Sequence, residues 1–326
     1  MMTGAADTGP SHLSVSRLYM RSFVADGNFS ADHVKQKNVK DDVWLLDGPG
    51  MMTGQQKYAE HLKIATEGRK KPGAASCENN FRAIDAANRG NSIYDATGIG
   101  CCACARHGCY APGSVVDFQL GERYANMDWS HLQAILNTHV RPIRICMGCY
   151  DVMCIYQENW PERIARNPLL TYPDILIEKA IGLFHVHGHK DECFFRFATS
   201  FIPGAAIVDG EVLETLWSVL NNISRSTRTA TLAHRAEILD DHMNDSNWKK
   251  MVGIVDFISR KYRRAVVNSQ ARREYHHDMT ASAGADNVAI WQREIEKAES
   301  ERMANAKVMD IMGARIKKRT YIIGIG

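Results

Sequence analysis

Short apolar runs followed by single acidic residues are the clearest pattern in the chain. Residues 143–154 are almost continuously apolar, which is typical of a strand buried on both faces. Asp151 lies near the end of this run, at the carboxyl edge where open α/β sheets collect their chemistry. Residues 18–24 predict a second strand, which leads directly to Asp26. Taken alone, Asp151 could instead start a loop or cap a helix, and Asp26-Gly27 could form a hairpin turn.

Other apolar patterns predict further strands and helices. Residues 115–125 and 181–189 are typical of strands, whereas residues 130–137 and 172–180 are typical of helices. Residues 210–220 repeat apolar side chains at helical spacing, which predicts an amphipathic helix. Strands and helices therefore alternate, as they do in α/β proteins.

Two acidic residues lie in the first turns of the helix predicted at residues 210–220. Glu214 lies beside the apolar stripe and Glu211 lies one turn earlier, so either side chain can point towards the sheet edge. Acidic residues in a first turn also interact favourably with the helix dipole. The pattern alone leaves both interpretations open.

Composition sets the size of the core and the expected state of the cysteines. The 326 residues, 45% of them hydrophobic, suffice for one large domain with an appendage or for two domains. No stretch reaches the roughly 18 apolar residues of a membrane span, so no membrane association is expected. Nine cysteines, some near histidines, favour reduced thiols or zinc over disulfides. Cys146 and Cys149 fall on opposite faces of their strand, and we predict that they and Cys154 are buried packing thiols.

Positive charge is concentrated at the end of the chain. The net charge is only +3, but residues 249–326 hold 16 Lys and Arg against 9 Asp and Glu. Such a basic segment favours a polyanionic partner such as nucleic acid. A solvated helical surface would have the same composition.

Cysteines and histidines form two candidate halves of a metal site. Cys104 and His107 have the two-residue spacer that lets a tight turn aim two ligands at one zinc ion. In a strand at residues 181–189, alternate histidines would share one face, with Cys193 nearby. That face could instead hold hydrogen-bonded histidines without metal.

The order of the predicted elements is compatible with a ribonuclease H-like fold. In that arrangement the first and fourth strands lie side by side, so Asp26 and Asp151 would approach each other and a helical acid such as Glu214 would complete the cluster. Clustered carboxylates repel one another unless divalent cations neutralise them. Two Mg²⁺ ions about 4 Å apart could then activate a water or a 3′-hydroxyl for phosphodiester cleavage.

Motifs spread over most of the chain share one family resemblance. They are Asp26-Gly27-Asn28-Phe29, residues 103–108, residues 113–118 with Gly121-Glu122-Arg123, Tyr150-Asp151, residues 182–189 and residues 209–217. Together they resemble the Kyakuja-Dileera-Zisupton (KDZ) transposases, and residues 224–250 are similar to the fungal members of that family.

The resemblance implies a DDE-type transposase core that uses Mg²⁺ or Mn²⁺, with Asp26 and Asp151 as its first two acids. Residues 214–218 are similar to the Glu-Arg-x-aromatic-Ser pattern at the catalytic acid of hAT transposases, which favours Glu214 as the third acid. Thr215 stands where that pattern has Arg, so Glu211 stays an alternative.

Related transposases also carry a Cys-x-x-His element. The resemblance therefore supports a structural zinc site built from Cys104, His107, His189 and Cys193. It further implies DNA as partner, both transposon ends and target, with a homo-oligomer and a nuclear location as expectations.

The predicted organisation is a catalytic core at residues 1–224, with an insertion at about 35–110, and a basic helical region at residues 225–326. Because the first acid already stands at position 26, without the usual cysteine-rich region ahead of it, we expect a truncated copy of the transposase. Two alternatives remain. One is an inactive transposon-derived protein that binds DNA or partners, and the other is a zinc hydrolase acting on a small molecule.

Overall fold

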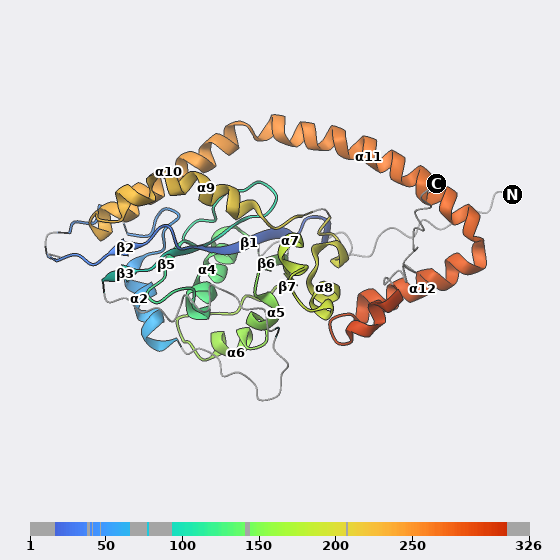
Figure 1. Cartoon of the computed structure of the whole chain (residues 1–326), viewed down its shortest axis with the longest axis horizontal. Coiled ribbons are helices and arrows are strands. Elements are labelled where there is room, and N and C mark those ends of the chain that lie inside the picture. The colour runs from blue at the N-terminus through green and yellow to red at the C-terminus, as the bar shows by residue number, and fades with distance from the viewer. Residues whose placement is uncertain are drawn as a thin grey trace, which may run out of the picture. The chain divides into compact units, whose positions relative to one another are not determined.

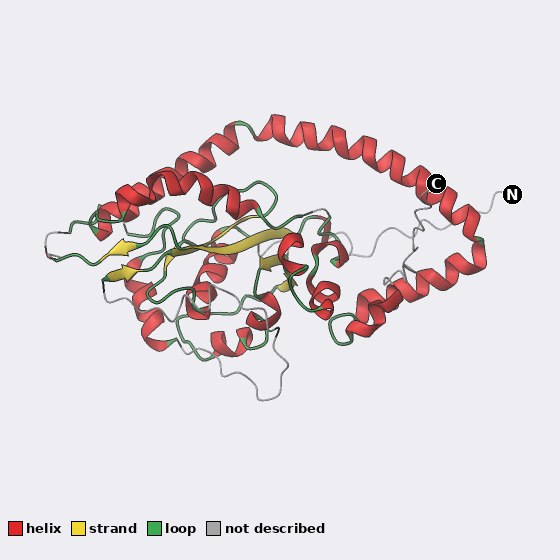
Figure 2. Cartoon of the chain, in the orientation of Figure 1, coloured by secondary structure: helices red, strands yellow, loops and turns green. Residues whose placement is uncertain are grey.

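The computed structural model describes residues 17–311, apart from 38–39, 41, 46, 66–76, 78–92, 141–143 and 207. The chain forms two compact units, Met1–Val255 and Asp256–Gly326. Strands and helices are mixed in the first unit, as an α/β protein requires (Figure 2). The predicted division after residue 224 stays a prediction.

A five-stranded mixed sheet forms the centre of the first unit. Its strands are β1 (Arg21–Asn28), β4 (Ile99–Cys104), β5 (Val116–Asp117), β6 (Ile145–Tyr150) and β7 (Leu176–Ala180), in the spatial order β5-β4-β1-β6-β7. β1, β6 and β7 run parallel to one another, whereas β4 is antiparallel to both β1 and β5. A small antiparallel pair, β2 (His33–Val34) and β3 (Tyr94–Ala96), lies outside this sheet.

Helices cover both faces of the sheet (Figure 1). Figure 1 shows α9 and α10 on one face and α4, α5 and α6 on the other. The helices among the described residues of this unit are α2 (Gln55–Ile64), α4 (Tyr124–Asn137), α5 (Met153–Tyr156), α6 (Trp160–Ala165), α7 (Leu183–Val186), α8 (Asp191–Phe197), the 3-10 helix η2 (Thr199–Phe201), α9 (Val212–Thr227) and α10 (Leu232–Val252). No helix in the described part of the chain is both long and apolar enough to cross a membrane.

The apolar strands bury alternate residues in two separate cores. Phe23 and Cys146 belong to the core on the α4 side, whereas Val24 and Cys149 belong to the core that α9 and α10 cover. Because side chains alternate along a strand, consecutive residues of β1 and β6 supply opposite faces. Cys146 and Cys149 are therefore buried packing thiols on opposite faces, as predicted.

Two stretches around β7 differ from the sequence prediction. Residues 176–180, predicted as part of a helix, form β7, and residues 181–189, predicted as a strand, form α7 and a turn. The reason is tertiary, since β7 pairs in register with β6 from Ile145↔Leu176 to Cys149↔Ala180, and such pairing overrides local preference.

Two other boundaries also shift. In residues 115–125 only Val116–Asp117 is a strand, and α4 already begins at Tyr124 rather than at residue 130. The helix predicted at residues 210–220 is confirmed as α9, which continues to Thr227.

The range predicted as an insertion, residues 35–110, also contributes to the sheet. It contains α2 and β3, and also β4, which lies between β1 and β5. Residues 66–76 and 78–92 of this range lie outside the described residues. The end of the range therefore belongs to the sheet and not to an added segment.

The second unit is helical. α11 (Ile254–Ala283) enters it from the first unit and buries none of its residues, all of which the structure describes. α12 (Ala285–Glu301) packs with the 3-10 helix η3 (Ala306–Ile311), where Ala298, Ala306 and Met309 are buried. The basic side chains of α11 thus lie on exposed helical surface.

Candidate functional site

The parallel pairing of β1 and β6 sets two aspartates side by side. The last paired residues are Ala25 and Tyr150; Asp26 comes next in β1, and Asp151 directly follows β6. In a parallel pair, residues in register point to the same face, so the two carboxylates share the side of the sheet that α9 covers. The register therefore brings together two acids that lie 125 positions apart in the sequence.

Helix α9 adds two glutamates to the same place. Asp26, Asp151, Glu211 and Glu214 line one hollow, together with His185 from α7. The apolar face of α9 is buried against the sheet, which fixes the first turns of this helix over the sheet edge. We call these four carboxylates the acidic centre.

Two neutral or basic side chains hold the acidic centre in position. The His185 Nδ1 atom lies 3.3 Å from Asp151 Oδ2, and its Nε2 atom lies 3.1 Å from Glu211 Oε2. On the other side, Trp217 Nε1 donates a hydrogen bond of 2.8 Å to Asp26 Oδ2. One imidazole thus joins the sheet edge to α9, while the indole orients the first aspartate.

Burial and mutual repulsion raise the pKa of Asp26, Asp151 and Glu211. Burial raises the pKa of Asp26 to about 6, and the charge of Glu214 adds to this rise, against the hydrogen bonds from Trp217 and the Gly27 backbone. Burial likewise raises the pKa of Asp151 to about 7; His185 opposes the rise, whereas the other three carboxylates add to it. Burial also raises the pKa of Glu211.

The donor atoms of the acidic centre suit a hard divalent cation. Carboxylate oxygens are the ligands that Mg²⁺ and Mn²⁺ prefer. Glu211 Oε1 is buried and has no hydrogen-bond partner among the described residues, although its other oxygen contacts His185. A buried carboxylate oxygen without a partner is costly, and a bound cation would satisfy it.

The geometry does not separate the two candidates for the third acid. Glu214 and Glu211 both line the hollow, so Glu211 does not point elsewhere. Glu211 is the one connected to Asp151 through His185, whereas Glu214 is the one that raises the pKa of Asp26.

Glu122 is an acid near this centre that the sequence patterns did not single out as a site residue. Tyr150 donates a hydrogen bond of 2.6 Å from its hydroxyl to Glu122 Oε1, and a Cβ on Gly27 would come within 2.8 Å of Glu122 Oε2. Burial raises the pKa of Glu122 to about 8, and the charges of Asp26 and Asp151 contribute. The Gly-Glu-Arg motif that precedes α4 contains this residue, but the motif alone does not indicate a catalytic or metal-binding role.

The three histidines predicted to share one strand face go to three different places, because α7 and a turn replace that strand. His185 faces the acidic centre, and His187 packs on Phe194 with a ring-centroid distance of 5.1 Å. His189 lies among cysteines instead. The role of His185 beside carboxylates was therefore missed.

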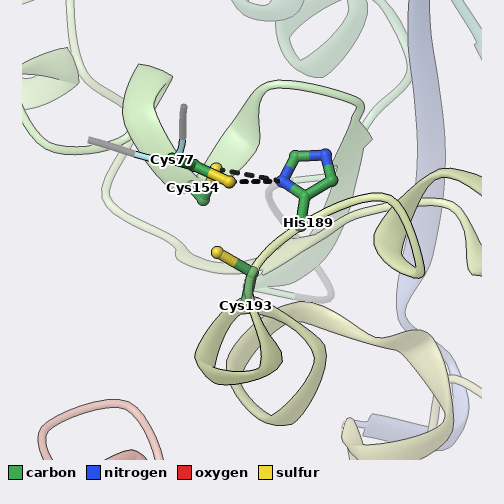
Figure 3. A group of neighbouring side chains, drawn as sticks. All are labelled: Cys77, Cys154, His189 and Cys193. Carbon is green, nitrogen blue, oxygen red and sulfur yellow. Dashed lines mark hydrogen bonds between the residues drawn. The ribbon is translucent and has the colours of Figure 1, made fainter. Parts of the chain in front are cut away.

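The predicted zinc set is not the group that the structure forms. His189 and Cys193 lie with Cys77 and Cys154, and this cluster of three cysteines and one histidine could bind zinc (Figure 3). Cys154 is thus a candidate ligand and not only a packing thiol.

Cys104 and His107 lie apart from this cluster. They contact each other in the turn after β4, where Cys104 Sγ lies 3.3 Å from His107 Nδ1. β4 is separated from β7 by two strands of the sheet, whereas α8 packs against α5 and α7. This topology explains why His189 and Cys193 find a cysteine of α5 and not the pair after β4.

Fold and site together define an α/β protein with an acidic centre at the carboxyl ends of two neighbouring parallel strands and a cysteine-rich cluster beside it. The family model of the Kyakuja-Dileera-Zisupton (KDZ) transposases matches residues 19–247, and the chain belongs to this family. No curated protein and no solved structure matches the chain. The chain is therefore a transposase-related protein, and both proposed centres lie within the matched range.

Proposed function

We propose that the chain is a DDE-type transposase core that cleaves DNA and transfers strands with Mg²⁺ or Mn²⁺. The observation that carries this proposal is that Asp26, Asp151 and Glu214 line one hollow although they come from β1, the end of β6 and α9. The ordered acids argue against the zinc hydrolase alternative, which a wide separation of these acids would have revived, so we do not pursue it.

The sheet supports a ribonuclease H-like fold for this core. β1 and β6 are the first and fourth of the five sheet strands in chain order, and they lie side by side and parallel. That adjacency is what a ribonuclease H-like arrangement needs in order to bring its first two acids together. We propose the same fold here.

Asp26, Asp151 and one of the two α9 glutamates would hold the metal. Bound Mg²⁺ would neutralise the carboxylates and activate an attacking water or 3′-hydroxyl. The protein side chains prepare this site: His185 fixes Asp151 and Glu211 relative to each other, and Trp217 fixes Asp26. Their restraint keeps the donors in place before the cation arrives.

The test measures Mn²⁺ binding by electron paramagnetic resonance and nicking of plasmid DNA that carries the terminal repeats of the element. We expect Asp151→Asn and Asp26→Asn to lower nicking by more than about 100-fold, since even outer-shell partners of a metal contribute 10–100-fold. Glu158→Gln, a change of an exposed carboxylate outside the hollow, is the matched control. Nicking that survives in Asp151→Asn would refute the assignment.

The third acid is decided by the same assay. We expect Glu214→Gln to abolish nicking, as Asp151→Asn does, and Glu211→Gln to lower it only partly. The reverse order would assign the third position to Glu211.

A second candidate function is DNA binding without catalysis. Its supporting observation is α11, which exposes six cationic side chains against three acidic ones. The cationic residues are Arg260, Lys261, Arg263, Arg264, Arg272 and Arg273. This function predicts DNA binding that weakens steeply with salt and is unchanged in Asp26→Asn. Either function acts on DNA, and we expect a nuclear location and a homo-oligomer for the active form.

A further inference from the structure

Four side chains from three separate segments converge beside the carboxyl ends of β6 and β7. Cys154 belongs to α5, Cys193 to α8, and His189 to the turn between α7 and α8, whereas Cys77 comes from the chain between α2 and β3. Their candidate ligand atoms all lie within 4.8 Å of one another (Figure 3). The three cysteines are buried and the histidine is half-buried.

The spacing of these atoms is close to that of a tetrahedral zinc site. With Zn–S bonds of about 2.3 Å and Zn–N bonds of about 2.0 Å, the ligand atoms of a tetrahedral site stand about 3.5–3.8 Å apart. His189 Nδ1 lies 3.4 Å from Cys77 Sγ and 3.4 Å from Cys154 Sγ. Small rotations of the side chains would therefore complete the coordination.

The chemistry of the ligands selects the metal and the kind of site. Three sulfurs and one imidazole nitrogen suit zinc, and four protein ligands leave no position for a water, as in structural zinc sites. All nine cysteines lie in the described part and are free thiols, so no disulfide occupies these sulfurs. A closed site of this kind stabilises structure and does not itself catalyse.

Two of the ligands stand close in sequence to Asp151 of the acidic centre and to His185, which contacts it. Cys154 follows Asp151 by three residues, and His189 follows His185 by four. Asp151 and His185 are themselves in contact, with His185 Nδ1 3.3 Å from Asp151 Oδ2. A metal that joins α5, which starts two residues after Asp151, to the turn after α7 would therefore fix both members of this contact.

We propose that Cys77, Cys154, His189 and Cys193 bind one structural Zn²⁺, which holds Asp151 and His185 in place at the acidic centre. The zinc site itself rests only on the cluster, whereas its positioning role rests on the proposed function of the acidic centre. The two parts are therefore tested by separate measurements.

The zinc site is tested on the full chain, purified under reducing conditions and analysed by mass spectrometry for metal content. We expect one zinc per chain in the wild type and its loss in Cys193→Ser and His189→Ala. His189→Cys should retain zinc because a set of four cysteines binds it equally well. Cys104→Ser, a matched change outside the cluster, should also retain it.

Cobalt substitution of the wild type gives a readout that does not depend on a variant folding. Co²⁺ bound by three thiolates and one imidazole should show strong sulfur-to-metal charge-transfer absorption and tetrahedral d–d bands. Folded wild-type protein that binds neither zinc nor cobalt would overturn the site. Loss of zinc in Cys104→Ser but not in Cys193→Ser would also overturn it.

The positioning role is tested by the Mn²⁺ affinity of the acidic centre, followed by electron paramagnetic resonance. We expect Cys193→Ser to weaken Mn²⁺ binding by about 10–100-fold, as loss of a positioning partner does, while His189→Cys should keep the wild-type affinity. An unchanged affinity in zinc-free Cys193→Ser would overturn the positioning role. Zinc binding with nicking that survives Asp151→Asn would overturn the catalytic proposal but leave the zinc site standing.

Discussion

Replacing Asp151 by asparagine should stabilise the chain when no divalent cation is bound. The carboxylate of Asp151 lies among three others, and burial together with their charges raises its pKa from the ordinary value of 3.8 to about 7. The asparagine side chain would keep the shape of the aspartate and would remove the charge. Above neutral pH the variant therefore avoids a repulsion that the wild type carries.

The sign and the size of the effect follow from linkage. Between pH 4 and pH 7 the folded chain retains a proton on Asp151 that the unfolded chain has released, so wild-type stability falls as the pH rises through this window. A rise of the Asp151 pKa from 3.8 to about 7 corresponds to a loss of about 4 kcal/mol in the free energy of unfolding, if solvent does not screen the charges. Since 34% of the Asp151 side chain is exposed, we reduce this figure to about 1–2 kcal/mol.

The assay is urea unfolding in buffer depleted of divalent cations, at pH 5 and at pH 8. We expect Asp151→Asn to be more stable than the wild type by about 1–2 kcal/mol at pH 8 and by less at pH 5. Asp174→Asn, which changes a carboxylate whose side chain is 97% exposed, should behave like the wild type at both pH values. Added Mn²⁺ at pH 8 should stabilise the wild type but not Asp151→Asn.

Two results would contradict the expected stabilisation of Asp151→Asn. One is wild-type stability that rises between pH 5 and pH 8 without metal. The other is an Asp151→Asn variant that is less stable than the wild type at pH 8, since this would show that the contact with His185 outweighs the repulsion.

Three further predictions concern the surroundings of the acidic centre and the core. Gly27→Ala should lower the free energy of unfolding by about 1–3 kcal/mol, because the added Cβ would meet both Glu122 and Phe118 at 2.8 Å. In the same chemical denaturation assay, Gly253→Ala should be tolerated. Trp217→Phe removes the hydrogen bond to Asp26, so the pKa of Asp26 should rise further. The pH midpoint of Mn²⁺ binding should therefore move upwards, and an unchanged midpoint would contradict the role of this hydrogen bond. Arg235→Leu should lower the free energy of unfolding in urea by about 3–5 kcal/mol, because it leaves the buried Asp117 without its ion-pair partner at 2.7 Å. Arg144→Ala breaks an exposed ion pair and should lower the same free energy by less than about 1 kcal/mol.

The sequence predicted those site residues that lie on, or directly after, a strand or helix with a clear apolar repeat. The apolar run before Asp151 predicted a doubly buried strand, and the structure buries Cys146 and Cys149 in opposite cores accordingly. The helical stripe after Gly210 likewise predicted α9, which carries Glu211 and Glu214 to the hollow. These features depend on local pattern alone, so one sequence suffices to predict them.

Features that depend on strand pairing could not be predicted in the same way. β7 has a mixed pattern, and it becomes a strand because its backbone pairs with β6, which no local signal reveals. The structure groups His189 and Cys193 with partners other than the predicted ones for a related reason: Cys104 and His107 have good local spacing, whereas Cys77 joins the cluster from a distant part of the chain. Topology, not spacing, decides which of these side chains meet.

A single strand end serves both centres because the chain changes from strand to helix there. Asp151 directly follows β6 and lies on the α9 side, in line with Cys149, whereas Cys154, one helical turn later in α5, belongs to the core on the α4 side. In α7 and its following turn, His185 and His189 divide in the same way between the acidic centre and the cysteine cluster. The segments that follow β6 and β7 thus each reach both faces of the sheet. A substitution that loosens the cysteine cluster should therefore displace Asp151 and His185 although it changes neither residue.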